Sequence, residues 1–375
     1  MDKTALVTDE WQYVLNMMPP DLEESAVEKL ALVRRREIGS AADLLRMALC
    51  YGLCDLSLRQ TAAWAKLNAV GELSDVAVLK RLRGASDWLG HLVLRWMQER
   101  GLTSAAPAAR VQVLDASTIS GPGSRGTDWR LHLGLDLAHL TISSVQLTGP
   151  EGGESLLRHQ LAPGQMVVGD RAYANRPAVA AALERAVHVV IRSNWQYFPL
   201  STRRGAALDL LRALELLEPG EIGDWPVQLQ AQGRRYPLRL IALRKSQAAA
   251  HQEIRRLRRI ASRKNRPLSR DSRRDAHFIY LITDLPAQAL PAAQALELYR
   301  LRWQIELFFK RLKGIVHIDK LRAKDQRLSR TYLYANLLGA LIADELCQEA
   351  LAFFPWGYPL RPATRQPVAA AADGG

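Results

Sequence analysis

Cysteine and long apolar runs are both scarce in this sequence. Among 375 residues there are three cysteines, Cys50, Cys54 and Cys347. An odd number without a paired framework argues against a disulfide-stabilised secreted protein and favours a reducing compartment. No apolar run reaches the roughly 18 residues of a membrane-spanning helix, and the N-terminus lacks the basic and apolar regions of a signal peptide. We therefore expect a soluble cytoplasmic protein with no membrane partner.

Two of the cysteines lie one helical turn apart, which is the spacing of half a metal site. Cys50 and Cys54 have no second Cys or His pair at ligand spacing nearby. The favoured interpretation is that both are small buried side chains.

Acidic residues are outnumbered by basic ones. The 51 Lys and Arg residues against 38 Asp and Glu give a formal charge of +13. Such a surplus favours a polyanionic partner such as nucleic acid. The alternative is a basic but ordinary enzyme from a GC-rich genome. Hydrophobic residues make up 48% of the chain, so a core can be buried and disorder is not the expected main state.

Residues 1–105 are predicted to form a helical N-terminal domain. Apolar residues recur at helical spacing over 30–33 and again over 41–49. A short helix over 58–65, a turn in which Ser74 caps the next helix, and a basic helix over 78–83 outline a helix-turn-helix. DNA binding is one interpretation of this outline, and a plain helical bundle is the other.

After an Ala- and Pro-containing linker, residues 106–192 alternate between strands and helices. Strands are predicted over 111–115, 129–137, 140–147, 165–170 and 188–191, and helices over 152–160 and 176–186. The first and fourth strands are apolar runs that end in Asp115 and Asp170, as buried strands of a central sheet do. The order predicts an α/β fold with a mixed five-stranded sheet.

Residues 193–285 interrupt this rhythm with short alternating segments and are predicted to be a mostly β insertion. Residues 286–356 return to the core with one long amphipathic helix over 291–313 and another over 332–354. The tail, residues 357–375, is expected to be disordered.

Within the insertion, Arg255–Arg274 contains ten Arg and Lys residues and a single acid, Asp271. A solvated or disordered loop is one interpretation. Contact with DNA phosphates is favoured, with Arg263, Lys264 and Arg266 as candidate residues.

Three acids are candidates for metal chemistry. Asp115 and Asp170 end two buried strands, with small residues beside them, and Glu306 lies on the later helix. Phosphodiester cleavage needs a nucleophilic oxygen, charge relief at phosphorus and help for the leaving group, all of which two Mg²⁺ ions about 3.5–4 Å apart can supply. Taken singly, an Asp at a strand end can be a turn residue, and a helical Glu can be merely solvated.

The surroundings of Glu306 favour the functional interpretation. Tyr299, Arg302, Glu306 and Lys313 are separated by three, four and seven positions, so one helix would carry them on one face. An ion pair between Arg302 and Glu306 explains part of this line. It does not explain why Tyr299 and Lys313 continue it.

The pattern Tyr299-x2-Arg302-x3-Glu306-x6-Lys313 resembles the signature of bacterial insertion-sequence DDE transposases of the hairpin-forming cut-and-paste type. Residues 113–118 resemble their first catalytic block, residues 129–132 the segment after it, and residues 168–173 the second block. The resemblance covers about residues 105–350.

This resemblance implies an RNase H-like catalytic core with a β insertion. Asp115, Asp170 and Glu306 would hold two Mg²⁺ ions, or Mn²⁺ in their place. The partners would be double-stranded DNA, at the terminal inverted repeats and at the target, and a second copy of the chain in a synaptic homodimer. The protein would associate with the nucleoid when bound to DNA.

The same resemblance gives roles to five further residues. Tyr299, Arg302 and Lys313 would grip phosphates beside the cleavage point, since Arg suits bidentate contacts and Lys supplies a point charge. Arg171 and Tyr173 would lie near the DNA end, just past the second metal ligand.

One departure concerns the DNA hairpin. Relatives of this type use a Trp in the last strand of the insertion, whereas residues 277–281 contain none. Phe278 or Tyr280 could stack on a base instead, as could Trp195 or Trp225, although each could equally be a core aromatic. Three alternatives to a transposase stay open: a domesticated nuclease, an inactive DNA-binding regulator and a ribonuclease.

Overall fold

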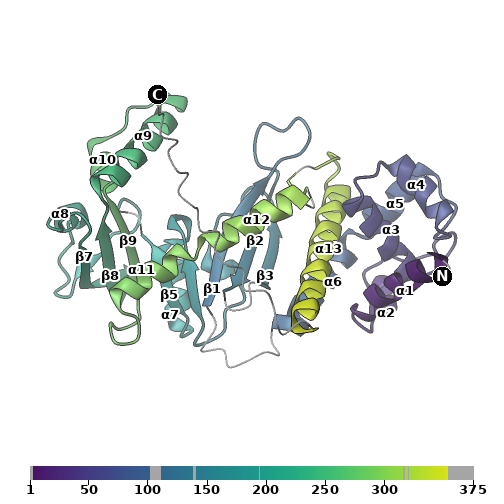
Figure 1. Cartoon of the computed structure of the whole chain (residues 1–375), viewed down its shortest axis with the longest axis horizontal. Coiled ribbons are helices and arrows are strands. Elements are labelled where there is room, and N and C mark those ends of the chain that lie inside the picture. The colour runs from purple at the N-terminus through teal and green to yellow at the C-terminus, as the bar shows by residue number, and fades with distance from the viewer. Residues whose placement is uncertain are drawn as a thin grey trace, which may run out of the picture.

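One mixed sheet of nine strands runs through the centre of the molecule (Figure 1). The computed structural model describes residues 3–101, 111–137, 141–193, 195–315, 317–319 and 321–353. The strand order is β3-β2-β1-β4-β5-β9-β8-β7-β6. The strands are β1 (Val111–Ile119), β2 (Trp129–Asp136), β3 (Thr141–Thr148), β4 (Met166–Gly169), β5 (His188–Arg192), β6 (Ser201–Thr202), β7 (Ile222–Ala231), β8 (Arg234–Arg244) and β9 (Phe278–Thr283).

The sheet is larger than the five strands expected from the sequence. Strands β2 to β5 occur close to where they were predicted, but β1 continues past Asp115 to Ile119, because its pairing with β2 extends that far. Strand β9 pairs antiparallel with β5 and continues the sheet into the insertion. The insertion strands therefore extend the central sheet. Two predicted segments, the turn at residues 138–139 and the tail, lie outside the described residues, as does most of the linker after residue 105.

Parallel pairing between β1 and β4 sets the geometry of the centre. Leu114 pairs with Gly169 at the end of the ladder, so Asp115 and Asp170 are the next residues of two neighbouring strands. Val113, Leu114, Val167 and Val168 are all buried, as expected for strands covered on both faces.

Six helices precede the sheet: α1 (Lys3–Asn16), α2 (Leu22–Glu28), α3 (Ala41–Leu53), α4 (Leu58–Leu67), α5 (Asp75–Gly84) and α6 (Ser86–Gly101). Ser57 and Gln60 form a capping box at α4, and the Ser74 hydroxyl accepts from the Ala77 amide at α5, as predicted. The helix expected over 30–33 is absent, because Leu30 has a positive φ of 57° and the chain there is an extended loop. Of the two cysteines expected to be buried, Cys50 is buried but Cys54 is exposed.

The long helix predicted over 291–313 is two helices. α11 (Ala292–Arg300) ends in a tight turn at Leu301 and Arg302, and α12 (Trp303–Ile315) then begins. The final helix, α13 (Gln326–Phe353), starts earlier than predicted and packs against α3 and α6 of the N-terminal domain. Within the described residues, no helix is both long and apolar enough to cross a membrane.

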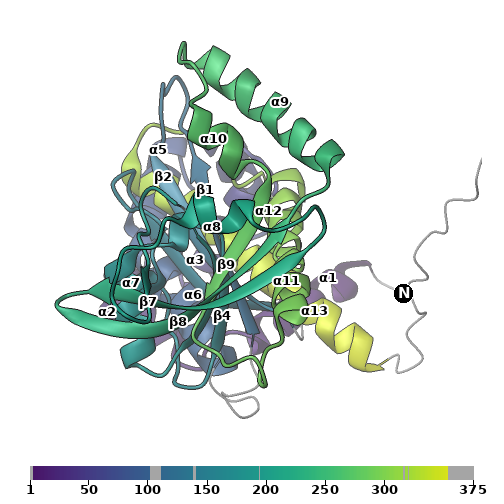
Figure 2. The same cartoon turned by 90° about the vertical axis from the view of Figure 1, so that its left-hand side faces the viewer.

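The basic stretch of the insertion is helical. α9 (Gln247–Arg263) and α10 (Arg270–Asp275) connect β8 to β9 and project beyond the sheet (Figures 1 and 2). We call residues 247–275 the basic arm. The insertion also contains α8 (Leu210–Glu215). The helix predicted over 176–186 is α7 (Arg176–Glu184), which lies between β4 and β5 and is capped by Asn175.

A buried polar cluster lies between β2, β3 and the short 3-10 helices η2 (Leu156–Arg158) and η3 (Arg171–Tyr173). His132 Nε2 is 3.0 Å from the Thr148 hydroxyl, and His159 Nδ1 is 2.7 Å from the Ser144 hydroxyl. Burial is the main reason that the pKa of His132 falls to about 4 and that of His159 to about 3. Both imidazoles are therefore neutral near pH 7.

This cluster predicts acid sensitivity. The pKa of His159 is about 3 in the fold and 6.5 in an ordinary environment, so the unfolded chain binds the extra proton as pH falls below 6.5. Stability is then lost on acidification, with a slope of up to about 1.4 kcal/mol per pH unit. His159→Gln keeps a polar side chain but removes this proton, so its unfolding free energy, from urea denaturation at pH 7 and pH 5, should fall less than that of the wild type. An unchanged pH slope would contradict the assignment.

Candidate active site

Asp115 and Asp170 occupy neighbouring positions at one edge of the parallel strands. Asp115 Oδ1 accepts from the amide of Ala116 at 2.9 Å. Asp170 caps η3, where its Oδ1 accepts from the amide of Ala172 at 2.8 Å. Each carboxylate keeps its second oxygen for another ligand, and the pairing of β1 with β4 sets the two side by side.

The electrostatics of Asp115 link all three predicted acids. Burial is the first cause of its raised pKa, about 6, and the negative charges of Asp170 and Glu306 raise it further. The backbone bond from Ala116 and the charge of Arg302 act in the opposite direction. Three carboxylates from distant parts of the chain thus act on one region.

Glu306 lies in the first turn of α12, and its side chain is 55% exposed. Arg302 Nη2 donates to Glu306 Oε1 at 2.6 Å. The same guanidinium lies 5.6 Å from the centre of the buried Tyr299 ring. Arg302 therefore joins Tyr299 of α11 to Glu306 of α12 across the helix break, where the sequence predicted one continuous helical face. Lys313 lies in the last turn of α12 and is half-buried.

The three predicted acids offer the carboxylate oxygens that suit a hard divalent cation, but the three carboxylates are not gathered at one point. Within the described residues, no three His, Cys, Asp or Glu side chains are gathered closely enough to hold a metal ion. Asp115 and Asp170 provide adjacent carboxylate oxygens, the ligands that Mg²⁺ prefers. Glu306 would complete the set of ligands if its carboxylate left Arg302 and bound a cation instead. The exposure of the Glu306 side chain leaves room for that change of partner.

Sequence reasoning missed a fourth acid, Glu154. It precedes η2 and lies 3.5 Å from Arg130. Burial raises the pKa of Glu154 to about 6, and the charges of Asp170 and Asp115 add to the effect. The only signal in the sequence was an acid after two glycines between the catalytic blocks, which is too common a pattern to select it.

Arg171 and Tyr173 do not share one environment. Arg171 Nη2 donates to Asp275 Oδ2 at 2.9 Å, and Asp275, at the end of α10, also accepts from the Tyr280 hydroxyl at 2.8 Å. The second catalytic block is thereby tied to the base of the basic arm. Tyr173 is fully buried, with its hydroxyl 3.5 Å from His159 Nε2, so the structure does not bring it to the surface.

Exposure separates the aromatic candidates for base stacking. Phe278 and Tyr280 are core residues, whereas Trp195 and Trp225 are half-buried. Two aromatic residues not considered from the sequence are far more exposed, Tyr197 at 74% after β5 and Trp303 at 49% at the start of α12.

The three cationic candidates of the basic arm lie at the end of α9 and just beyond it. Arg263, Lys264 and Arg266 are exposed, and none forms an ion pair with a described residue. By contrast, Arg256 is held by Glu253, and Arg274 by Glu215 and Asp271.

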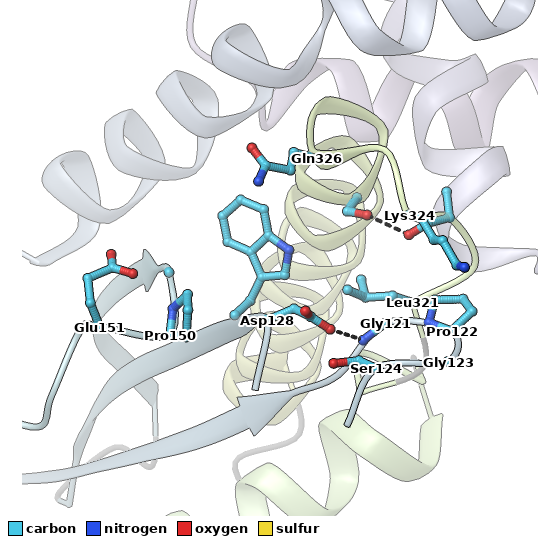
Figure 3. A pocket seen from close by; sticks show the side chains of 14 residues that line it. Gly121, Pro122, Gly123, Ser124, Asp128, Pro150, Glu151, Leu321, Lys324 and Gln326 are labelled. Carbon is cyan, nitrogen blue, oxygen red and sulfur yellow. Dashed lines mark hydrogen bonds between the residues drawn. The ribbon is translucent and has the colours of Figure 1, made fainter. Parts of the chain in front are cut away.

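A cavity of about 570 Å³ lies beyond the far end of β1 (Figure 3). The loop between β1 and β2, the end of β3 and the segment before α13 enclose it. Two of its lining residues are bonded to each other: the Asp128 carboxylate accepts a hydrogen bond from the Gly121 amide. Its lining carries the acids Asp128 and Glu151 beside Lys324, so it is not an obvious anion site.

Comparison with known proteins agrees with this geometry. Residues 106–342 match the family model described as the transposase DDE domain. The chain is 36% identical over 356 residues to the InsL protein of insertion sequence element IS186A of Escherichia coli K12, covering 92% of this chain and 96% of that protein.

Two further relatives extend the comparison. The transposase for insertion sequence element IS421 of Escherichia coli is 36% identical over 357 residues, with 92% and 96% of the two chains covered. The transposase for IS231E of Bacillus thuringiensis subsp. finitimus is 25% identical over 89% of this chain and 78% of its own. The chain therefore belongs to the DDE transposase family of bacterial insertion sequences.

Proposed function

We propose that this DNA transposase cuts and joins the ends of an insertion sequence through a two-metal centre formed by Asp115, Asp170 and Glu306 on an RNase H-like core. The observation that carries the proposal is the pairing of Leu114 with Gly169, which sets Asp115 beside Asp170 on neighbouring parallel strands. The raised pKa of Asp115, from burial and from the charges of Asp170 and Glu306, agrees with it. Crowding several carboxylates in a partly buried place costs free energy that a bound cation would recover.

The protein's own groups have distinct tasks in this scheme. Asp115 and Asp170 would hold the ions through carboxylates that the β1–β4 pairing sets side by side, and Glu306 would supply the third carboxylate. The bound divalent cations would activate a water and then a 3′-hydroxyl as nucleophiles and neutralise charge on the scissile phosphate. Arg302, released from Glu306 and backed by the Tyr299 ring, is then free to bind a phosphate oxygen, with Lys313 farther along α12.

The partners follow from this chemistry. Double-stranded DNA at the terminal inverted repeats and at the target would be the substrate, and a homodimer would bring two ends together. The N-terminal helices α4 and α5 and the basic arm would hold the DNA on either side of the catalytic edge. We place this activity in the bacterial cytoplasm, on nucleoid DNA.

The three acids give the first test. Asp115→Asn, Asp170→Asn and Glu306→Gln each remove one charged metal ligand at nearly constant shape. Mg²⁺-dependent cleavage of a duplex carrying the element's own terminal repeat should fall at least about 100-fold in each, while DNA affinity stays unchanged. Single-turnover cleavage on sequencing gels and fluorescence anisotropy would measure the two quantities.

Glu297→Gln is the matched control for Glu306→Gln. Glu297 lies on α11 and pairs with Arg300 three residues later, without contact to the site. It should cleave as the wild type does. Full cleavage by any of the three acid variants would refute the metal centre, and cleavage without joining in a plasmid assay would favour a nuclease on the same fold.

The basic arm gives a second test. Replacing Arg263, Lys264 and Arg266 together by Ala removes three exposed, unpaired cations. Because phosphate contacts carry no sequence information, affinity should weaken at least about tenfold, and by the same factor, for a terminal-repeat duplex and an unrelated duplex. Arg256→Ala, which removes a cation already paired with Glu253, should change little. Weakening confined to one duplex would contradict a purely positioning role.

A further inference from the structure

A second basic surface lies in the N-terminal domain, away from the catalytic acids. An open groove of about 540 Å³ separates the loop of residues 30–37 from helix α5. Arg34, Arg36 and Glu37 line the loop side, and Lys80 and Arg81 line the helix side. We call this the N-terminal groove.

The cations of the groove are held close to one another. Arg81 Nη2 donates to the backbone carbonyl of Arg34 at 2.6 Å. Burial, followed by the positive charge of Arg36, lowers the pKa of Arg81. Like charges at this range repel one another, so the fold maintains an arrangement that an anion would stabilise.

Pairing distinguishes the cations of the groove from their neighbours. On the same loop Arg35 pairs with Glu23, and on α5 Arg83 pairs with Asp325. Arg36 and Lys80, which line the groove, have no ion pair with any described residue. The unpaired cations are thus the ones that face the opening.

Two apolar side chains at the rim of the groove are exposed to solvent beside its cations. Leu30 and Val33 are 70% and 67% exposed beside these charges. On the helix side, Ala77 and Gly84 leave the backbone open to close approach. Cations beside exposed apolar groups suit the edge of a DNA duplex, where phosphates alternate with deoxyribose and thymine methyl groups.

The position of α5 fits the same partner. In Figure 1 the basic arm lies toward the left-hand end of the long axis and α5 toward the right-hand end, with the sheet and α12 between them. A duplex that runs along this axis past α12 would therefore approach the arm at one end and α5 at the other.

We infer that the N-terminal groove binds the sugar–phosphate backbone of the element end, at a distance from the cleaved bond, with Arg36 and Lys80 as its phosphate contacts. The inference rests on the proposed function, because it takes duplex DNA as the partner. It extends that function by adding the loop of residues 30–37 to the helix-turn-helix as a DNA-binding element.

The salt dependence of DNA binding tests this inference. Each phosphate contact contributes about 0.9 to the slope of log affinity against log salt. In the full-length double variant Arg36→Ala/Lys80→Ala, the slope for a duplex with the terminal repeat should shrink by nearly two. Lys29→Ala/Arg95→Ala is the matched control, because it removes two cations of the same domain that lie outside the loop, α4 and α5 and already pair with acids. Its net charge change is identical, and its slope should stay close to that of the wild type.

A slope that is unchanged in Arg36→Ala/Lys80→Ala, or one that shrinks equally in the control, would overturn the inference. The charge-preserving variant Arg36→Lys/Lys80→Arg should restore the slope, which separates lost contacts from a damaged domain. Its failure to do so would also count against the groove. If the wild type lacks Mg²⁺-dependent cleavage but the slope of the double variant shrinks as expected, DNA binding by the groove is supported and the metal centre is refuted. If the wild type cleaves normally but the slope of the double variant is unchanged, the metal centre is supported and DNA binding by the groove is refuted.

Discussion

Repulsion between carboxylates placed just past the end of the parallel ladder of β1 and β4 is the constraint on which the rest of the site depends. The register of β1 against β4 fixes Asp115 beside Asp170, and packing against α12 brings Glu306 into the same field. Glu154 adds a fourth negative group from the segment after β3. The fold tolerates this crowding because Arg302 and Arg130 compensate part of it.

The sequence was most informative where a single physical rule decides the outcome. Apolar runs followed by an acid located Asp115 and Asp170, since a buried apolar run needs cover on both faces. The run before Asp170 is the end of β4, whereas β1 continues beyond Asp115 to Ile119. A capping hydroxyl, that of Ser74, located the start of α5. The spacing of Arg302 and Glu306 predicted their ion pair, which survives the helix break because the two residues remain within one turn of each other.

Other features depend on contacts that no local pattern contains. The break after α11 separates two packing surfaces, because α11 contacts β4, β5, β7 and β8 whereas α12 contacts β1. Every residue at the break is nevertheless compatible with a continuous helix. The helical form of α9 was missed for a different reason: Ala250, Ile254, Leu257 and Ala261 do recur at helical spacing, but the high charge of the segment suggested a solvated loop. The burial of Tyr173 follows from His159, a residue from another segment. Such long-range packing overrides local preference.

The unbroken hydrogen bonding from β5 through β9 to β8 has a consequence for how the chain can vary. Deleting the whole insertion would strip β5 of its neighbour and leave a bare strand edge prone to aggregation. The helical hairpin between β8 and β9 lies outside the strands and is anchored at its base by Asp275 and Arg274, so its outer part can change in length while the sheet stays intact. Evolution can therefore lengthen or shorten this projection to suit a new stretch of substrate without rebuilding the catalytic platform.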